Sequence, residues 1–258
     1  MSSIYKDNMR TILWLIRTVF YVLCAEPDRR RINKLIAKGD NLTARLFVQS
    51  RVRHWSLAML RYAGVTVEVH GFENIPKAPA LFLPNHQSDW DIMVVESYLP
   101  NCGILAKKEL QKIPLISKWM ELLGAIFIDR GNARQSVKAL MEVEKTLKSG
   151  NNFIIFPEGT RSRGEDVGEF KSGAFRIAFR HGFPIVPVSI DGTYKIMEAN
   201  NGHWIKPGHV ILTILPPIET KGMDKAEQKE LGEKIRAQIL EAREESRKIS
   251  DYYKEKKE

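Results

Sequence analysis

Cysteine is scarce in this sequence. Among 258 residues only Cys24 and Cys102 carry a thiol, and they are too far apart in sequence for the C-x-x-C spacing of a zinc or redox site. Two cysteines cannot build the dense disulfide framework of a small secreted domain. The cysteine content therefore favours a reducing compartment.

Long apolar runs are also missing. The strongly apolar segment "ILWLIRTVFYVLC" (12–24) is thirteen residues long and is interrupted by Arg17 and Thr18. A membrane-spanning helix needs about 20 apolar residues. The following "AEPDRRR" lacks the small residues of a signal-peptide cleavage site. The sequence therefore predicts neither a spanning helix nor a cleaved signal.

Several catalytic signatures are absent. The chain has no G-x-S-x-G, no G-x-x-x-x-G-K-[ST] and no H-E-x-x-H. These absences exclude the serine nucleophile elbow, the P-loop and the helical zinc-protease site in their usual forms. A nucleophile, if one is needed, must therefore come from elsewhere, and it can come from the substrate.

The net charge of +9 is unevenly distributed. Residues 1–62 hold 12 Lys and Arg against four Asp and Glu, residues 63–220 hold 17 of each, and residues 221–258 hold 11 against 10. The basic excess therefore belongs to the first quarter of the chain, where its partner must be sought.

That quarter predicts two amphipathic helices, at 12–24 and at 41–64 with Asp40 as the N-cap of the second. Aromatic and apolar residues beside arginines suit a membrane surface with anionic headgroups. A helical hairpin packed on the main domain and a nucleic-acid-binding segment are the alternatives. We interpret residues 1–62 as a two-helix membrane-associating region that binds no nucleic acid, and residues 63–258 as an α/β domain.

From Val65 onward strand-like and helix-like segments alternate. This alternation predicts a mostly parallel, mixed sheet with helices on both faces. The expected strands cover 65–70, 80–85, 103–107, 125–130, 152–157, 184–190 and 209–215. The expected helices cover 89–98, 113–123, 133–149, 172–181 and 224–250, the last with alternating charges typical of a solvated helix.

Polar residues gather in "NHQSDWD" (85–91), between two apolar runs. His86 and Asp91 would point about 140° apart on one helix, so they meet only if His86 lies in a turn and Asp91 in the first helical turn. A carboxylate on one ring nitrogen fixes the tautomer of a general base. Without a nucleophile of its own, such a pair suits activation of a substrate hydroxyl. A purely structural turn and a metal site using Asp89 as well are the alternatives.

The stretch "FPEGTRSRG" (156–164) places cations directly after a buried strand. Gly159 allows a tight turn with exposed N–H groups, Thr160 adds a hydroxyl, and Arg161 offers a planar fork that matches phosphate. Glu158 could orient an arginine or cap the turn.

Two further strand ends carry cations, namely Arg130 after one strand and Lys107 with Lys108 after another. Parallel sheets place ligand sites beyond the carboxyl ends of their strands. Three cationic strand ends in a segment of zero net charge favour one anion site over scattered, solvated cations.

These residues resemble the glycerolipid acyltransferase family, and most closely its bacterial 1-acylglycerol-3-phosphate acyltransferases. Four blocks carry the resemblance, in the family's order, over about residues 80–190: "NHQSDWD" (85–91), "GAIFIDRGN" (124–132), "FPEGTRSR" (156–163) and "IVPVSI" (185–190). The first and third blocks together are highly specific.

The resemblance implies a general base, His86, with Asp91 as its partner. It implies that the glycerol phosphate is bound with the help of Arg130, Glu158, Gly159, Thr160 and Arg161, and less firmly Lys107. Asp89 stands where the family varies, and it receives no catalytic role.

The reaction implied is acyl transfer from an acyl thioester, on coenzyme A or acyl carrier protein, to the 2-hydroxyl of lysophosphatidate, which yields phosphatidate. We expect no cofactor and no metal, because a thiolate already leaves readily. We expect one-sided, monotopic attachment at the cytoplasmic face of the cell membrane. An acyltransferase acting on glycerol 3-phosphate or another lysophospholipid, or a non-catalytic lipid-binding protein, remains the alternative.

Overall fold

The fold is given by a computed structural model that describes residues 2–100, 102–129 and 131–255. Within these ranges seven strands form one sheet in the order β1-β7-β6-β2-β5-β3-β4. Their bounds are β1 (Val65–His70), β2 (Leu81–Pro84), β3 (Cys102–Lys107), β4 (Ile126–Ile128), β5 (Asn152–Ile154), β6 (Ile185–Asp191) and β7 (Gly208–Ile214).

The sheet is mostly parallel, as the alternating pattern predicts. Strands β6, β2, β5, β3 and β4 run parallel to one another, whereas β7 is antiparallel to β6 and parallel to β1. The reversal occurs where residues 192–207 carry only short 3₁₀ helices. Antiparallel neighbours need no α-helical crossover, so this short connection suffices.

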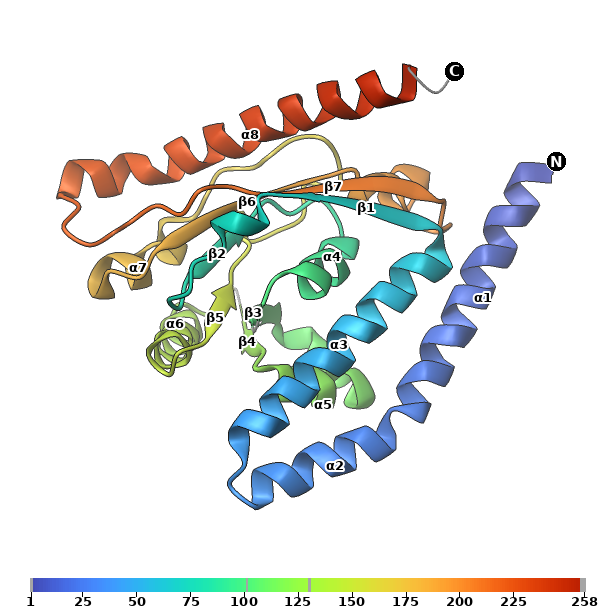
Figure 1. Ribbon diagram of the computed structural model, residues 1–258, viewed down its shortest axis with the longest axis horizontal. Helices are drawn as coiled ribbons and strands as arrows, with labels where there is room; N and C mark the ends of the chain where they lie inside the picture. The colour runs from blue at the N-terminus through green and yellow to red at the C-terminus, as the bar shows by residue number, and fades with distance from the viewer. Residues whose placement is uncertain (1, 101, 130, 256–258) are drawn as a thin grey trace.

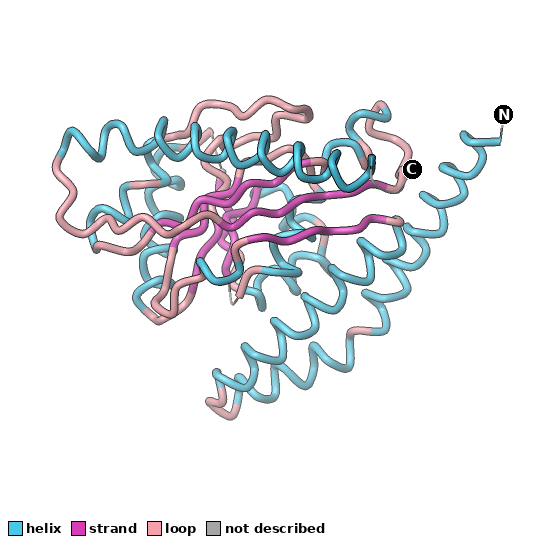
Figure 2. Tube along the Cα trace, turned by 45° about the horizontal axis from the view of Figure 1, so that its top comes forward, coloured by secondary structure: helices cyan, strands magenta, loops and turns pink. Residues whose placement is uncertain are grey.

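Helices cover both faces of the sheet (Figures 1 and 2). Their bounds in the described chain are α1 (Ser2–Cys24), α2 (Glu26–Ala37), α3 (Asn41–Ala63), α4 (Trp90–Tyr98), α5 (Pro114–Leu123), α6 (Ala133–Lys148), α7 (Arg176–His181) and α8 (Lys225–Glu255). Helices α3 and α4 share one apolar core with the sheet, and α6, α7 and α8 share the other.

Strand β2 shows how a single buried strand serves both cores. Its side chains alternate, so that Phe82 packs in the core with α3 and α4 while Leu81 and Leu83 pack in the core with α6 to α8. All three are fully buried. A continuous apolar run is therefore the pattern that a strand covered on both faces requires.

The N-terminal quarter contains one helix more than expected. Helix α2 lies between the two anticipated helices, and α1 begins near the N-terminus rather than at residue 12. The charged sequence of α2 conceals it, although Pro27 is tolerated in a first helical turn and Glu26 complements the helix dipole there. Asp40 does cap α3, since its side chain accepts the Thr43 N–H.

The expectation that no stretch could span a membrane was wrong on length. The segment Lys6–Ala37 is long and apolar enough to cross a bilayer by length and composition alone. Helix α1 has 23 residues, which corresponds to about 34 Å against about 30 Å of hydrocarbon. Polar residues before the apolar run continue the helix, and counting only the run underestimated it.

Helix α8 is not simply solvated, in contrast to the sequence interpretation. Leu231, Ile235 and Ile239 are buried at four-residue spacing and join the core with α6 and α7. Alternating charges on the other faces of the helix masked this apolar stripe. Residues 172–181 likewise form a 3₁₀ turn (Ser172–Ala174) and then α7, not one helix.

Candidate active site

The site lies where four strand ends meet. Strands β2, β5, β3 and β4 are adjacent and parallel, so their carboxyl ends lie at one edge of the sheet. His86 follows β2, Arg161 follows β5, and Lys107 ends β3. The backbone N–H of Ser162 donates to the carbonyl of His86 at 2.8 Å. The blocks after β2 and β5 are therefore in direct contact.

His86 and Asp91 meet as their spacing predicts. The ring Nδ1 of His86 lies 2.7 Å from Oδ2 of Asp91. Helix α4 begins at Trp90, so His86 is in the turn and Asp91 in the first helical turn. A proton on Nδ1 shared with this carboxylate leaves Nε2 as the acceptor. The His86 ring also stacks on Phe156, with ring centroids 4.1 Å apart.

Asp91 is fully buried and both of its oxygens are engaged. Besides His86, Oδ2 accepts the backbone N–H groups of Gln87 at 2.7 Å and Ser88 at 2.9 Å. Oδ1 accepts the hydroxyl of Thr193. Four donors hold the carboxylate, so its position is set independently of any substrate.

The other polar residues of the turn link the loops around the site. The side-chain amide of Asn85 bonds to both the carbonyl and the N–H of Ile190 in β6. Gln87 accepts the Gly192 N–H and donates to the carbonyl of Gly164, which joins two loops. These polar groups are buried but satisfied, which explains their density between two apolar segments.

The side chain of Glu158 holds the turn that contains His86. Its Oε1 accepts the His86 N–H at 2.6 Å and its Oε2 accepts the Gly168 N–H at 2.8 Å. Burial raises the pKa of this carboxyl, and the two backbone bonds oppose that rise. Glu158 therefore positions the His86 turn; a carboxylate in this place is not suited to contact a phosphate directly.

Gly159 is in the left-handed region, with φ of 70°. A Cβ there would lie 2.7 Å from Nζ of Lys171, so glycine admits a lysine that the sequence did not single out. Thr160 beside it is exposed. The turn therefore brings a hydroxyl and an additional cation to the strand edge.

Arg161 is half-buried and its Nη1 faces two carboxylates. It pairs with Asp89 and lies 3.5 Å from Oε1 of Glu198. Arg161, which the sequence predicts to bind an anion, is therefore in the site, and two acidic side chains face it there. Lys107 is exposed at the end of β3, and the neighbouring Lys108 is 3.7 Å from Asp129. Arg130 lies outside the described residues.

Besides Lys171, sequence reasoning missed Thr193 and Glu198. Both come from the connection between β6 and β7, about a hundred positions from Asp91 and Ser88, which they contact. No local pattern marks them. The only signal was that "NHQSDWD" contains more polar groups than one turn can satisfy.

Helix α8 holds the loop after β5. Arg236 donates to the carbonyl of Val167 at 2.7 Å. Arg243 is buried, contacts Asp191 at 3.1 Å and donates to the carbonyl of Glu165. The C-terminal helix therefore fixes the segment that follows Arg161.

The metal alternative does not fit this geometry. Asp91 already accepts four donors, and Asp89 pairs with an arginine. In the part of the chain that the structure describes, no group of three or more His, Cys, Asp or Glu side chains gathers to hold a metal ion.

The chain is similar to known acyltransferases in sequence and in fold. The acyltransferase family model matches residues 66–191. A 1-acyl-sn-glycerol-3-phosphate acyltransferase of Saccharomyces cerevisiae is 35% identical over 92% of this chain and 76% of its own length. The enzyme of that name from Pseudomonas aeruginosa is 31% identical over 69% of each chain. The crystal structure of the 1-acyl-sn-glycerophosphate acyltransferase of Thermotoga maritima superposes with a TM-score of 0.74 at 30% identity, covering 92% of this chain and 98% of that one.

Proposed function

This chain belongs to the 1-acyl-sn-glycerol-3-phosphate acyltransferase family, and from that premise we propose that it acylates the 2-hydroxyl of lysophosphatidate to make phosphatidate. The observation that carries the proposal is the buried His86–Asp91 pair at the same sheet edge as Arg161. A base without a protein nucleophile, beside a phosphate-binding cation, matches an acceptor that bears both a hydroxyl and a phosphate.

His86 acts as the general base. Its Nδ1–H is held by Asp91, so Nε2 takes the proton of the acceptor hydroxyl as the oxygen attacks the thioester carbonyl. The imidazolium that forms is stabilised by the Asp91 carboxylate. When the tetrahedral intermediate collapses, the C–S bond breaks and the proton can pass to the leaving thiolate, which restores neutral His86.

The cations position the acceptor. Arg161, Lys107 and Arg130 bind the phosphate, with Thr160 as an additional hydroxyl donor, so that the hydroxyl reaches the imidazole. Helix α8 and Glu158 keep this loop against the His86 turn. Binding the phosphate thus lowers the barrier mainly by orientation.

The donor is an acyl thioester of coenzyme A or of acyl carrier protein, and the reaction needs no metal. A thiolate leaves without Lewis-acid assistance, and both carboxylate oxygens of Asp91 are occupied by protein donors. Donor choice is decided by an assay with both carriers.

We propose that the protein attaches to the cytoplasmic face of the membrane from one side. The outer face of α1 exposes Ile16, Val19, Phe20 and Leu23, each at least 59% accessible. The opposite face is bound to the protein along its length, for example through the indole N–H of Trp14 on the Met59 carbonyl at 3.0 Å. A helix held by side contacts of this kind favours lying on the surface over crossing the bilayer alone.

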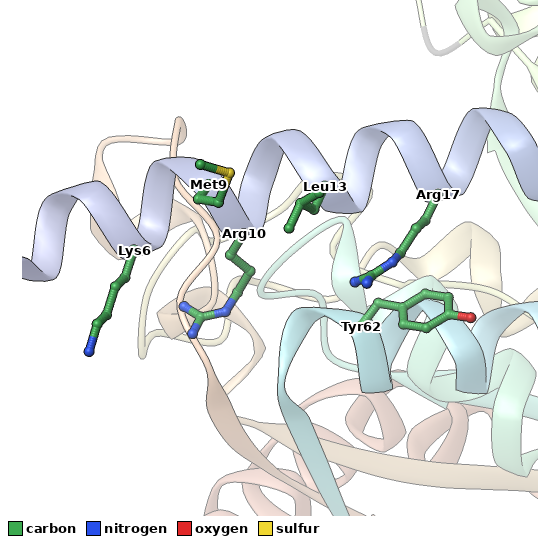
Figure 3. A pocket seen from close by; sticks show the side chains of 6 residues that line it. All are labelled: Lys6, Met9, Arg10, Leu13, Arg17 and Tyr62. Atoms are coloured by element: carbon green, nitrogen blue, oxygen red, sulfur yellow. The ribbon is translucent and has the colours of Figure 1, made fainter.

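A cleft of about 430 Å³ between α1 and α3 adds to this surface (Figure 3). It is lined by cationic and apolar side chains together, namely Lys6, Met9, Arg10, Leu13, Arg17 and Tyr62. Arg17 lies over the Tyr62 ring, 4.7 Å from its centroid. Cations beside exposed apolar groups are suited to anionic headgroups at the acyl boundary.

The test is turnover by the purified full chain with lysophosphatidate, glycerol 3-phosphate and lysophosphatidylcholine, each offered with both thioester carriers. We expect lysophosphatidate to have the highest kcat/KM. His86→Ala should abolish turnover while the protein still unfolds cooperatively. Preference for glycerol 3-phosphate would overturn the assigned acceptor. Lipid binding without turnover, unchanged in His86→Ala, would mean a non-catalytic lipid-binding protein.

A further inference from the structure

Glu198 connects two parts of the site although it lies outside every matched sequence block. It begins the 3₁₀ helix η5 (Glu198–Asn200), and its side chain is only 12% exposed. One oxygen accepts the Ser88 hydroxyl at 2.7 Å; the other accepts the Asp89 N–H at 3.3 Å and lies 3.5 Å from Nη1 of Arg161. The start of α4 and the arginine are thereby joined through one carboxylate.

Arg161 faces two acidic side chains, of which one is exposed and the other is mostly buried. Both Asp89 and Glu198 face the same guanidinium nitrogen, yet the Asp89 side chain is 77% exposed. A phosphate brought to this guanidinium would be repelled by two carboxylates. An exposed partner can rotate into solvent at little cost, because surface ion pairs are weak. A buried carboxylate that holds three donors cannot leave in that way.

We propose that Glu198 is a positioning residue that keeps Arg161 aimed into the site, and that Asp89 is a temporary counter-ion that the acceptor phosphate displaces. The proposal rests on the proposed function only in taking Arg161 as the phosphate ligand. It assigns the two carboxylates opposite effects on acceptor binding, and a merely structural network would not do so.

The two roles predict opposite changes in KM. Glu198→Gln keeps an oxygen that accepts the Asp89 N–H, and its NH₂ group can donate to the Ser88 hydroxyl, but the substitution removes the charge that holds Arg161. The KM for lysophosphatidate should rise about tenfold, the difference between a charged and a neutral hydrogen bond, while kcat and the KM for the thioester change by less than about threefold. Asp89→Asn should lower the KM for lysophosphatidate by up to about fivefold, as expected for removal of an exposed ion pair.

Two controls separate positioning from general damage. Glu73→Gln, an exposed acid in the 3₁₀ helix η1 (Phe72–Asn74), should leave all constants unchanged. In the Arg161→Ala background, Glu198→Gln should add less than about twofold to the acceptor KM, because its effect passes through the missing arginine. Additive losses in the double variant would overturn the proposal, as would an increased acceptor KM in Asp89→Asn.

A binding measurement keeps this test independent of the reaction. Inorganic phosphate is titrated calorimetrically into the full-chain wild type, Glu198→Gln, Asp89→Asn and Arg161→Ala. Weaker binding in Glu198→Gln and Arg161→Ala, with tighter binding in Asp89→Asn, supports the two roles even if the acceptor is not lysophosphatidate. Equal affinity in all four proteins overturns them, whatever the turnover assay shows.

Discussion

Replacing Asp91 by asparagine should disable catalysis while leaving the fold in place. The amide oxygen can take the position of Oδ2 and accept from His86, Gln87 and Ser88. The NH₂ group then faces the Thr193 hydroxyl, which can turn to accept it and donate to Gln87 Oε1, 3.3 Å away. The amide is therefore sterically and hydrogen-bond compatible with this position, and the variant differs chiefly in charge.

The size of the effect follows from these contacts. Three bonds to a carboxylate become bonds to a neutral amide, and each change costs about 1 kcal/mol, so the free energy of unfolding should fall by about 3 kcal/mol. For catalysis, a full charge 2.7 Å from the imidazolium interacts by about 6 kcal/mol at an effective dielectric constant of about 20. The amide dipole retains part of this. A loss of about 3–4 kcal/mol corresponds to a kcat lower by about 10²–10³.

The assay is steady-state turnover at saturating acceptor, with urea unfolding followed by circular dichroism. Asp224→Asn is the matched control, since this exposed aspartate accepts the Ala226 and Glu227 N–H groups but faces no histidine. Thr193→Ala removes the hydroxyl that bonds to Oδ1 and lies 3.3 Å from Gln87 Oε1, but it leaves the bond between His86 and Asp91 in place, and it should reduce kcat by less than about tenfold.

The reasoning fails if folded Asp91→Asn retains a kcat within about threefold of the wild type. It fails equally if Thr193→Ala is as damaging as Asp91→Asn, because the loss would then come from loop geometry and not from the charge on His86.

Three further outcomes are expected. Phe20→Glu should reduce flotation with anionic liposomes at least tenfold, because Phe20 is 68% exposed, whereas Met141→Glu on α6 should not. Burial raises the pKa of Glu96 from 4.5 to about 8. The folded state therefore retains a proton that the unfolded state loses, and stability should fall as pH rises from about 4.5 to about 8. In urea unfolding, the free energy of unfolding of Glu96→Gln should rise by about 3 kcal/mol relative to that of the wild type between about pH 5.5 and about pH 8. The prediction is refuted if the free energy of unfolding changes equally with pH in both proteins. Arg243→Met should lower the free energy of unfolding by about 3 kcal/mol in the same assay, because it leaves the buried Asp191 paired with one arginine fewer.

Much of the architecture was readable because its signals are local. Apolar runs bounded by turns identified the strands, and their alternation with helices required parallel pairing. The five-residue spacing of His86 and Asp91 placed them in contact once a helix start lay between them, and the structure confirms that contact at 2.7 Å. Each of these inferences involves residues within one element or one connection.

Other features depend on chain segments that meet only after folding. Thr193 and Glu198 reach the His86 turn because the connection between β6 and β7 passes over it, and the pairing of Arg161 with Asp89 follows from β2 and β5 being neighbours. The buried stripe of α8 was concealed by its charged faces. Composition and spacing along the chain thus determined most of the elements, the sheet class and the contact between His86 and Asp91. Only the tertiary structure decided which carboxylates surround Arg161, because electrostatic contact depends on distance in space and not on separation in sequence.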